Sequence, residues 1–340
     1  MRRVLVITNS LSGGGAERSA NILCRELKNQ SLEIALMPIN SGPLDLIDCN
    51  CQILAINRKY NSGIFVLVKS ILNYLIKLLR FRPDTIILNC DLPEFFGCLT
   101  PFHCKIIAVE HSPKPWQQRR RIGIVVRKIL KLRKVVWIAV SPKLRIWPDN
   151  SIPFAVISNP VEFNSLRIAN QTKLKRLFYV GRLSPEKNPL LAVEIAISSG
   201  LPIEVIGDGE LMKAIQSISI KNTSVVLRGY QTDPWKNFEP GDLVLLTSAW
   251  EGDGIALLEA INMDAPILVI DNPDFRFFEL PERNYCLGKN DFLEKINSYK
   301  LNLLDLKIPA NIRSRILENR NPTDFMQQWL KVIESKTKTH

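Results

Sequence analysis

Two carboxylates flank a glycine-rich segment in the second half of the chain. Glu251 and Glu259 stand on either side of Gly254, where a helix is predicted to begin. The amides of a first helical turn, here those of Ile255 and Ala256, have no partner within the helix and attract anions. Carboxylates accept hydrogen bonds from sugar hydroxyls. This spacing favours a site for a phosphate and a sugar, with a turn and a solvated surface helix as the alternative.

Positive charge and glycine also recur after other predicted strands of this half. Arg182 and Lys187 follow Gly181 in a loop before a helix. A guanidinium fork and an ammonium at this spacing suit a diphosphate, with a solvated loop as the alternative. Glycines further along allow the backbone to approach a base or ribose closely, unless they only form turns. These are Gly207 and Gly229, the latter preceded by Arg228.

A third glycine-rich loop lies near the N-terminus. Gly14 and Gly15 belong to a run of three glycines between a predicted first strand and a predicted helix. The backbone of such a run can approach a phosphate, although a tight turn explains it about as well. The run is neither a Gly-x-Gly-x-x-Gly motif nor a Walker loop.

Short apolar runs alternate with amphipathic segments along the chain, which predicts parallel sheets covered by helices on both faces. Such sheets bind ligands at the carboxyl ends of their strands, where these loops lie. The predicted strands are 4–9, 33–39, 52–56, 85–89, 105–110, 135–140, 154–157, 176–180, 203–206, 225–227, 243–247 and 267–270. The predicted helices are 16–29, 64–80, 119–134, 189–198, 211–218, 255–263 and 322–335.

The pattern restarts after a polar linker that follows residue 158, which predicts two doubly wound α/β domains in tandem. The last helix has Phe325, Trp329 and Val332 at helical spacing, so another element must cover this stripe.

Composition excludes several classes of protein. With 340 residues, 46% hydrophobic and 23% charged, the chain is neither disordered nor fibrous. It contains no apolar run long enough to span a bilayer, and its apolar start is too short for a signal peptide. We therefore expect a cytoplasmic protein. The seven cysteines, without a Cys-x-x-Cys pair, predict reduced thiols.

The net positive charge comes from the first half of the chain. Residues 1–170 carry 24 Lys and Arg against 11 Asp and Glu, whereas residues 171–340 carry 21 against 22. Such asymmetry predicts that the first half meets an anionic partner: a membrane surface, a nucleic acid or a phosphorylated substrate.

The most basic segment, residues 114–134, has nine Lys and Arg and no acid. Two interpretations stay open. Its apolar side could pack on the sheet and leave a solvated basic side, or the basic side could dock on anionic lipid, from which high salt would release it. The apolar side comprises Ile122, Val125, Val126 and Ile129, and the basic side Arg127, Lys128, Lys131 and Lys134.

Together these motifs resemble the retaining glycosyltransferases of family 4, of the group 1 type. The matching features are Glu251-x7-Glu259, Gly181-Arg182-x4-Lys187, an N-terminal Gly-Gly-x-Ala-Glu loop and an Asn-Pro-Val linker. The resemblance implies an α/β GT-B fold with two Rossmann-like doubly wound domains facing a cleft. Residues 1–158 would bind the acceptor and residues 159–321 a nucleotide-diphosphate sugar, while a helix within 322–340 would cross back to the first domain.

The resemblance also implies roles for particular residues. Arg182 and Lys187 would hold the donor diphosphate, Glu251 the transferred sugar, and His111, after a first-domain strand, would face that sugar. These four residues are the predicted catalytic set. From the motifs and the resemblance together, the predicted donor contacts are Gly14, Gly15, Gly181, Gly207, Arg228, Gly229, Asp253, Gly254, Ile255, Ala256 and Glu259.

The implied reaction is sugar transfer with retention, through an oxocarbenium-like transition state. Arg182, Lys187 and the helix start would stabilise the charge that develops on the leaving diphosphate, whose phosphate takes the acceptor proton. We expect no cofactor and, without an Asp-x-Asp at a strand end, no essential metal. Asp253 departs from the aromatic or apolar residue of many family members, and we hypothesise that it reads hydroxyls of the donor sugar.

The expected function is to add a sugar to a growing glycan in the synthesis of bacterial surface polysaccharide, O-antigen or lipopolysaccharide. We expect this acceptor glycan to be lipid-linked. Peripheral contact with the inner face of the cytoplasmic membrane would suit such an acceptor. Alternatives are a nucleotide-sugar epimerase, which would lack the Glu-x7-Glu arrangement, and a non-catalytic module that binds nucleotide sugar or partners. We expect no nucleic-acid partner, because few aromatic residues interleave the basic segment.

Overall fold

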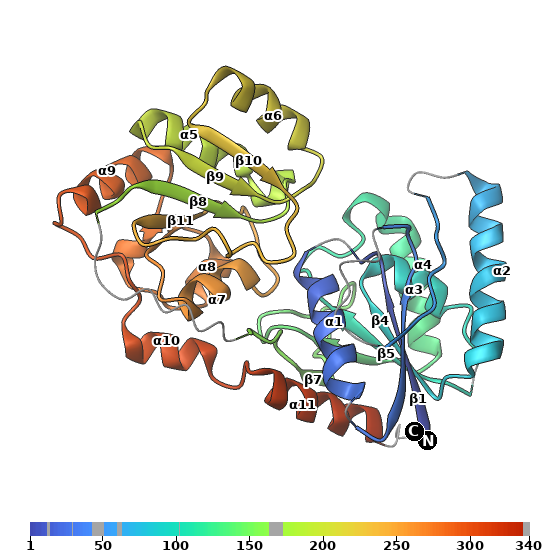
Figure 1. Ribbon diagram of the computed structural model, residues 1–340. Coiled ribbons are helices and arrows are strands. Elements are labelled where there is room, and N and C mark those ends of the chain that lie inside the picture. The colour runs from blue at the N-terminus through green and yellow to red at the C-terminus, as the bar shows by residue number, and fades with distance from the viewer. Residues whose placement is uncertain are drawn as a thin grey trace. The chain divides into compact units, whose positions relative to one another are not determined.

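The structure is a computed structural model that describes residues 1–11, 14–28, 30–42, 51–59, 63–101, 103–162 and 173–335. It divides into two units, Met1–Pro160 with the residues from Asn319 onward, and Val161–Glu318. Each unit is a parallel sheet with helices on both faces (Figure 1). The predicted domain boundaries, after residues 158 and 321, differ from these limits by two and three residues.

The first unit has a seven-stranded parallel sheet in the order β3-β2-β1-β4-β5-β6-β7. The strand order reverses between β1 and β4, which pair from Val4 with Thr85 to Thr8 with Asn89. Helices cover both faces, so the central strands are buried along nearly their whole length. The strands are β1 (Arg2–Thr8), β2 (Leu32–Pro38), β3 (Gln52–Ile53), β4 (Thr85–Asn89), β5 (Lys105–Glu110), β6 (Val136–Ala139) and β7 (Ala155–Val156).

Two groups of helices cover the first sheet. Residues of α2 (Ile64–Phe81), α3 (Asp91–Gly97) and α4 (Arg120–Leu132) share one core with one face of the sheet. Residues of α1 (Gly15–Lys28) and α11 (Pro322–Glu334) share a second core with the other face. A short 3-10 helix, Gln117–Arg119, precedes α4.

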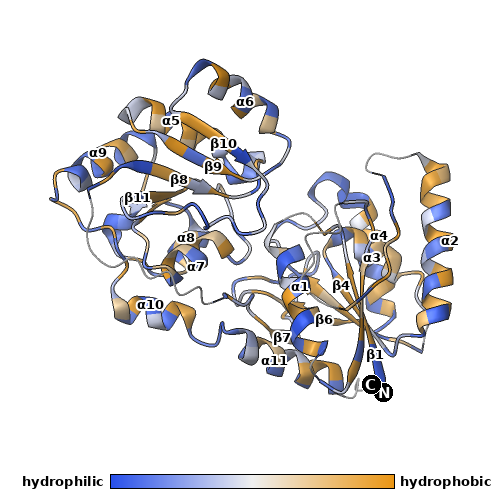
Figure 2. Ribbon diagram, in the orientation of Figure 1, coloured by the Kyte–Doolittle hydropathy of each residue, from blue (hydrophilic) through white to orange (hydrophobic). Residues whose placement is uncertain are grey.

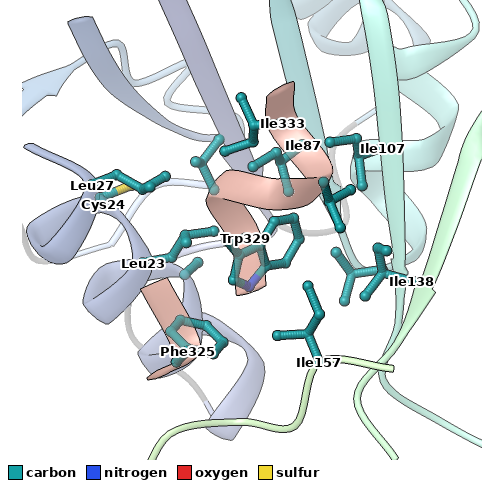
Figure 3. Packing of buried hydrophobic residues seen from close by; sticks show 14 of the residues in the cluster. Leu23, Cys24, Leu27, Ile87, Ile107, Ile138, Ile157, Phe325, Trp329 and Ile333 are labelled. Atoms are coloured by element: carbon teal, nitrogen blue, oxygen red, sulfur yellow. The ribbon is translucent and has the colours of Figure 1, made fainter. Parts of the chain in front are cut away.

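The C-terminal helix belongs to the first unit. Phe325 and Trp329 of α11 are buried, and Figure 3 shows them packed beside Leu23 of α1 and Ile157. This packing covers the apolar stripe and confirms that the chain returns to its first unit.

Helix α4 is rotated relative to the prediction. Ile122, Val125 and Ile129 are 50, 57 and 38% exposed, whereas Arg127 is 3% exposed. Gly123 explains part of this orientation, because a Cβ there would lie 2.3 Å from the ring of the buried Trp116. The expectation that Ile122, Val125 and Ile129 pack on the sheet while Arg127 lies on the solvated basic side is therefore wrong.

The second unit has a six-stranded parallel sheet in the order β10-β9-β8-β11-β12-β13, which reverses between β8 and β11. The strands are β8 (Arg176–Val180), β9 (Ile203–Ile206), β10 (Val225–Gly229), β11 (Asp242–Leu246), β12 (Ile267–Ile270) and β13 (Tyr285–Cys286). The helices are α5 (Pro189–Ser199), α6 (Met212–Lys221), α7 (Ile255–Asn262), α8 (Pro273–Arg276), α9 (Lys289–Lys300) and α10 (Ala310–Leu317), with 3-10 turns at Pro185–Lys187 and Glu282–Asn284. Residues of α5, α6 and α9 pack in one core, and residues of α7, α8 and α10 in the other.

Candidate functional site

The strand order places the predicted site of the second unit at a particular edge of its sheet. In doubly wound sheets, ligands bind where the strand order reverses, at the carboxyl ends of the strands. Here this point lies between β8 and β11. The loop after β8 carries Arg182 and Lys187, and the loop after β11 carries Glu251 and Asp253. The structure therefore brings these two motifs to one place.

Lys187 and Glu251 form an ion pair at that place. Lys187 Nζ lies 2.6 Å from Glu251 Oε1, with the side chains 27 and 8% exposed. Backbone contacts fix both loops: Ala249 N donates to Glu186 O over 2.7 Å, and Glu251 N donates to Asp274 Oδ2 over 2.7 Å. The sequence predicted both residues but assigned them separate partners.

Gly254 immediately precedes α7, within one residue of the predicted start, with a backbone φ of +68° that favours glycine. The amides of Ile255 and Ala256 belong to the first turn of α7, and no side chain caps this turn. Asp253 before it is buried. A buried carboxylate beside these amides gives the loop groups that could accept from and donate to a sugar phosphate.

Glu259, further along α7, is fixed by a residue that sequence reasoning missed. Trp235 Nε1 donates to Glu259 Oε2 over 2.7 Å, and both residues are buried. Trp235 stacks on Phe178 of β8, with ring centroids 5.8 Å apart. No motif in the sequence links residue 235 to residue 259, because Trp235 follows β10 and meets α7 only in the core that both share with Phe178.

The predicted glycines lie at the ends of β8, β9 and β10. Gly207 N donates to Gly229 O over 2.9 Å, and Gly181 N donates to Ile206 O over 3.1 Å. At Gly207, a Cβ would lie 1.9 Å from Gly181 O. Close backbone packing at this edge is therefore a structural reason for Gly207, independent of any ligand.

Arg228 lies where the pairing of β10 with β9 shifts in register. Arg228 Nε donates to Glu204 Oε1 over 3.3 Å, and Glu204 is buried. Arg176 Nη1 donates to the other carboxylate oxygen of Glu204 over 2.7 Å. The structure thus gives Arg228, predicted as a donor contact, a partner on the neighbouring strand.

Gly207→Ala is expected to lower the free energy of unfolding by about 2–3 kcal/mol, because the new Cβ meets Gly181 O in a strained backbone conformation. Gly200→Ala is the matched control: its φ is also positive, at +66°, but no atom lies within 4 Å, so about 1 kcal/mol is expected. Urea unfolding followed by tryptophan fluorescence measures both, and equal losses would contradict the role of the contact.

In the first unit, the strand order reverses between β1 and β4, and three elements meet there. Gly14 N donates to Glu17 Oε2 over 3.0 Å at the start of α1, which begins at Gly15. Asn89, at the end of β4, donates through Nδ2 to Ala16 O over 2.8 Å. Gly13, the first of the three glycines in the run, lies outside the described residues.

His111, predicted as catalytic, follows β5 and contacts the same Asn89. Its Nε2 lies 2.5 Å from Asn89 Oδ1, so with the amide oxygen as acceptor Nε2 carries the proton. Burial lowers the pKa of His111 to about 4, so the ring is neutral at neutral pH. Sequence reasoning missed Asn89, although a polar residue directly after an apolar strand is a signal that could have identified it.

A buried charge cluster lies beside His111. Arg127 of α4 donates through Nη2 to Glu94 Oε1 over 2.6 Å and through Nη1 to Glu110 Oε2 over 2.5 Å. Trp116 Nε1 donates to Glu94 Oε2 over 2.7 Å. These four residues are buried, and Glu110 is the neighbour of His111 in the chain. The cluster therefore ties α3 and α4 to the segment that carries the predicted histidine.

Two carboxylates share the single guanidinium of this cluster, and burial shifts their titration. Burial raises the pKa of Glu110 to about 7, and it also raises the pKa of Glu94 and of the neighbouring Asp91. A carboxyl that holds its proton near neutral pH limits the negative charge buried around Arg127.

We expect Glu110 to make the free energy of unfolding fall as the pH rises from about 4.5 to about 7, because the folded state binds its proton more tightly. At 1.36 kcal/mol per pKa unit, the loss is at most about 3 kcal/mol. Glu110→Gln should remove this fall, as measured by urea unfolding between about pH 5 and about pH 8.

His111→Gln separates the effect of Glu110 on the pH dependence of stability from an opposing effect of His111. The low pKa of His111 removes stability as the pH falls from about 6.5 to about 4, so its replacement should leave the Glu110 effect more visible. An unchanged pH profile in Glu110→Gln would contradict the assignment.

Among the described residues, no group of three or more His, Cys, Asp and Glu side chains could hold a metal ion. Six of the seven cysteines are described and are free thiols, and Cys49 lies outside the described residues. Within the described parts of the chain, no helix is long and apolar enough to cross a membrane.

Comparison with protein families gives a match within the second unit. Residues 162–290 match the family described as "Glycosyl transferases group 1". Poly(ribitol-phosphate) alpha-N-acetylglucosaminyltransferase of Staphylococcus aureus is 25% identical over 287 residues, which cover 77% of this chain and 58% of that protein. UDP-Gal:alpha-D-GlcNAc-diphosphoundecaprenol alpha-1,3-galactosyltransferase of Escherichia coli is 29% identical over 153 residues, 42% of this chain and 36% of that protein. The chain thus spans less than two thirds of the length of these relatives.

Solved structures match nearly the whole chain. A mutant of S. aureus TarM in complex with fondaparinux, alpha-GlcNAc-glycerol and UDP matches with a TM-score of 0.75, 14% identity and coverage of 98% of this chain and 100% of that chain. Anabaena HepE in complex with UDP and glucose matches with a TM-score of 0.76, 15% identity and coverage of 99 and 100%. The predicted α/β fold of the GT-B type is thereby confirmed.

Proposed function

Because residues 162–290 match the group 1 glycosyl transferases, we propose that the chain transfers a sugar from a nucleotide-diphosphate donor to an acceptor glycan, with retention, as a member of family 4. One observation carries the proposal. The Lys187–Glu251 ion pair, Arg182 and the uncapped start of α7 meet at the β8/β11 reversal, inside the segment that matches the family.

The proposed donor is a UDP-sugar. Two of the similar structures are complexes with UDP, and the E. coli relative is named for a UDP-Gal donor. We assign the diphosphate to Arg182, Lys187 and the first-turn amides of α7, and the ribose to Glu259, whose position Trp235 fixes. Hydrogen-bond donors and cations arranged in advance stabilise charge that develops on a leaving diphosphate.

Sugar recognition is assigned to Glu251, Asp253 and His111. The ion pair with Lys187 holds Glu251 at the site, and the neutral ring of His111 can exchange hydrogen bonds with a hydroxyl without adding charge. Asp253 is buried, so we propose that it selects among donor sugars by accepting from their hydroxyls. The leaving phosphate accepts the proton of the acceptor hydroxyl, so this route needs no metal and no carboxylate nucleophile.

The proposed acceptor is a lipid-linked glycan in bacterial surface polysaccharide, O-antigen or lipopolysaccharide synthesis. The E. coli relative is named for a diphosphoundecaprenol-linked acceptor, and a similar structure is named as a lipopolysaccharide outer core galactosyltransferase. The first unit is the proposed acceptor-binding unit, working at the inner face of the cytoplasmic membrane.

A thermal-shift screen against UDP-, GDP-, ADP- and dTDP-sugars tests the proposal. We expect selective stabilisation by UDP-sugars, because a ligand that binds only the folded state raises its stability. Arg182→Ala and Glu259→Ala should abolish it. Lys213→Ala, on an exposed position of α6, is the control. Absence of stabilisation by every nucleotide sugar would favour a non-catalytic protein, and turnover without an acceptor would favour an epimerase.

A further inference from the structure

Helix α2 buries one side and exposes an apolar stripe on the other. Its buried side consists of Ser70, Tyr74, Leu78 and Phe81. A surface helix ordinarily exposes polar side chains, but Figure 2 shows that most of α2 is coloured as hydrophobic. The exposed stripe consists of Phe65 (87% exposed), Val68 (50%), Leu72 (56%), Ile76 (48%) and Leu79 (70%).

Helix α4 exposes a second stripe of the same kind. Leu132 is 85% exposed, and it continues the series of Ile122, Val125 and Ile129 along the outer side of the helix. Helix α4 is held in this orientation by the core contacts of Val126 and Leu130 and by the ion pairs of Arg127. Because the buried side is fixed in this way, the stripe cannot turn inward without breaking the cluster.

The two stripes lie on the same side of the first unit. Tyr74 and Leu78 of α2 share one core with Val126 and Leu130 of α4, on one face of the sheet. Helix α3 joins this layer, since Phe96 contacts Tyr74 with ring centroids 5.1 Å apart. The opposite sides of α2 and α4 therefore both point away from this face. We call their exposed side chains the α2/α4 surface.

The charges on these helices are all positive. Neither α2 nor α4 contains an Asp or Glu. Lys131 pairs with Asp149 over 2.5 Å, where both side chains are largely exposed. Helical periodicity places Lys69 and Arg80 beside the stripe of α2, and Arg121 and Lys128 beside that of α4, while the other cations lie further round each helix. The cations outside the buried cluster are Lys69, Lys77 and Arg80 on α2, and Arg120, Arg121, Lys128 and Lys131 on α4.

We propose that the α2/α4 surface docks on a bilayer that contains anionic lipid, with both helices in the plane of the interface. A bilayer supplies an apolar phase and a layer of negative charge side by side, which matches the stripes and their flanking cations. A second copy of this surface would place cations opposite cations, and a nucleic acid supplies phosphates without an apolar phase.

This docking adds a membrane-binding surface to the proposed function. It rests on that function only in assuming that the acceptor is lipid-linked. It differs from the electrostatic docking predicted for residues 114–134, because α2 contributes and apolar side chains insert. Salt should therefore weaken binding without being its only determinant.

Flotation with vesicles of equal amounts of phosphatidylcholine and phosphatidylglycerol tests the proposal on the full chain. The double variant Leu72→Gln, Ile76→Gln is expected to weaken binding at least about tenfold, since two exposed side chains lose their insertion. Lys69→Gln and Lys128→Gln should each weaken it about fivefold and reduce the salt dependence. Ile220→Gln, on a 77% exposed position of α6 in the second unit, is the matched control and should bind as the original chain does.

Three outcomes would overturn the proposal: no binding to anionic vesicles, equal binding by the Leu72→Gln, Ile76→Gln variant, or a dimer in sedimentation that this variant dissolves. Thermal stabilisation by nucleotide sugars, measured on the same variants without vesicles, is expected to stay unchanged. Loss of vesicle binding with donor stabilisation retained separates failure at this surface from failure of the proposed transferase.

Discussion

Lys187→Met is expected to lower kcat by about 10²- to 10³-fold, as the loss of one preorganised donor to developing negative charge does in other enzymes. The methionine keeps the length and apolar stem of the side chain but removes the ammonium. Lys187 Nζ lies at the β8/β11 reversal, 2.6 Å from Glu251 Oε1. Steady-state transfer from a UDP-sugar, with donor KM measured separately, checks this expectation.

The ion pair requires a control, because the variant also leaves the buried Glu251 without its partner. Glu251→Gln keeps an acceptor at that position, so its thermal stability shows how much the pair contributes to folding. Lys213→Met, on α6, tests the loss of a lysine elsewhere in the second unit. A kcat of the Lys187→Met protein within about threefold of the original, in folded protein, would contradict the role of the ammonium.

Arg127→Met is expected to destabilise the first unit by about 3–5 kcal/mol, because the buried carboxyls of Glu94 and Glu110 lose the guanidinium that binds both of them. Arg127 is 3% exposed and Glu94 is 1% exposed, so water cannot replace the lost partner without rearrangement. Arg127→Lys should recover only part of the loss, since an ammonium cannot bind both carboxylates with the geometry of the guanidinium. Urea unfolding measures the difference.

Lys128→Met is the matched control on the adjacent, exposed position of α4, and it should change stability by no more than about 0.5 kcal/mol. Adding Glu110→Gln to Arg127→Met should restore part of the stability above about pH 7, because an amide replaces a buried carboxyl that would otherwise lose its proton there without a partner. If Arg127→Met and Lys128→Met were equally stable, the buried cluster would not contribute as the structure implies.

The alternation of strands and helices was predictable because fully buried parallel strands are continuous apolar runs between polar ends. The predicted strands at 85–89, 105–110, 176–180, 203–206 and 267–270 have the observed bounds. Helix α3 (Asp91–Gly97) was missed, since seven residues that include Pro93 are too few for helical periodicity to stand out. Strand β13 (Tyr285–Cys286) is too short to be recognised from a pattern.

The candidate site was predictable to the level of its loops. Lys187, Glu251 and Gly254 were predicted because strand-end loops of doubly wound sheets bind ligands, and the structure places their loops at the β8/β11 reversal. The same rule predicted Arg228 as a donor contact, and the structure adds a pairing of its side chain with Glu204 on β9. Position along the chain locates a residue at a sheet edge, whereas the direction of a long side chain depends on the charges that folding places near it.

The order of amino acids alone establishes the two doubly wound halves, the glycines at their turns and the residue types that suit a sugar diphosphate, because hydrophobic periodicity and backbone sterics act over a few neighbouring residues. It does not establish which side of α4 is buried. Arg127 meets Glu94 and Glu110, and Trp116 meets Glu94, only after α3, α4 and β5 pack together. That packing neutralises a cation inside the core and leaves Ile122 and Val125 exposed. Contacts between segments distant in the sequence therefore outweigh the tendency of a charged side chain to be exposed and of an apolar one to be buried.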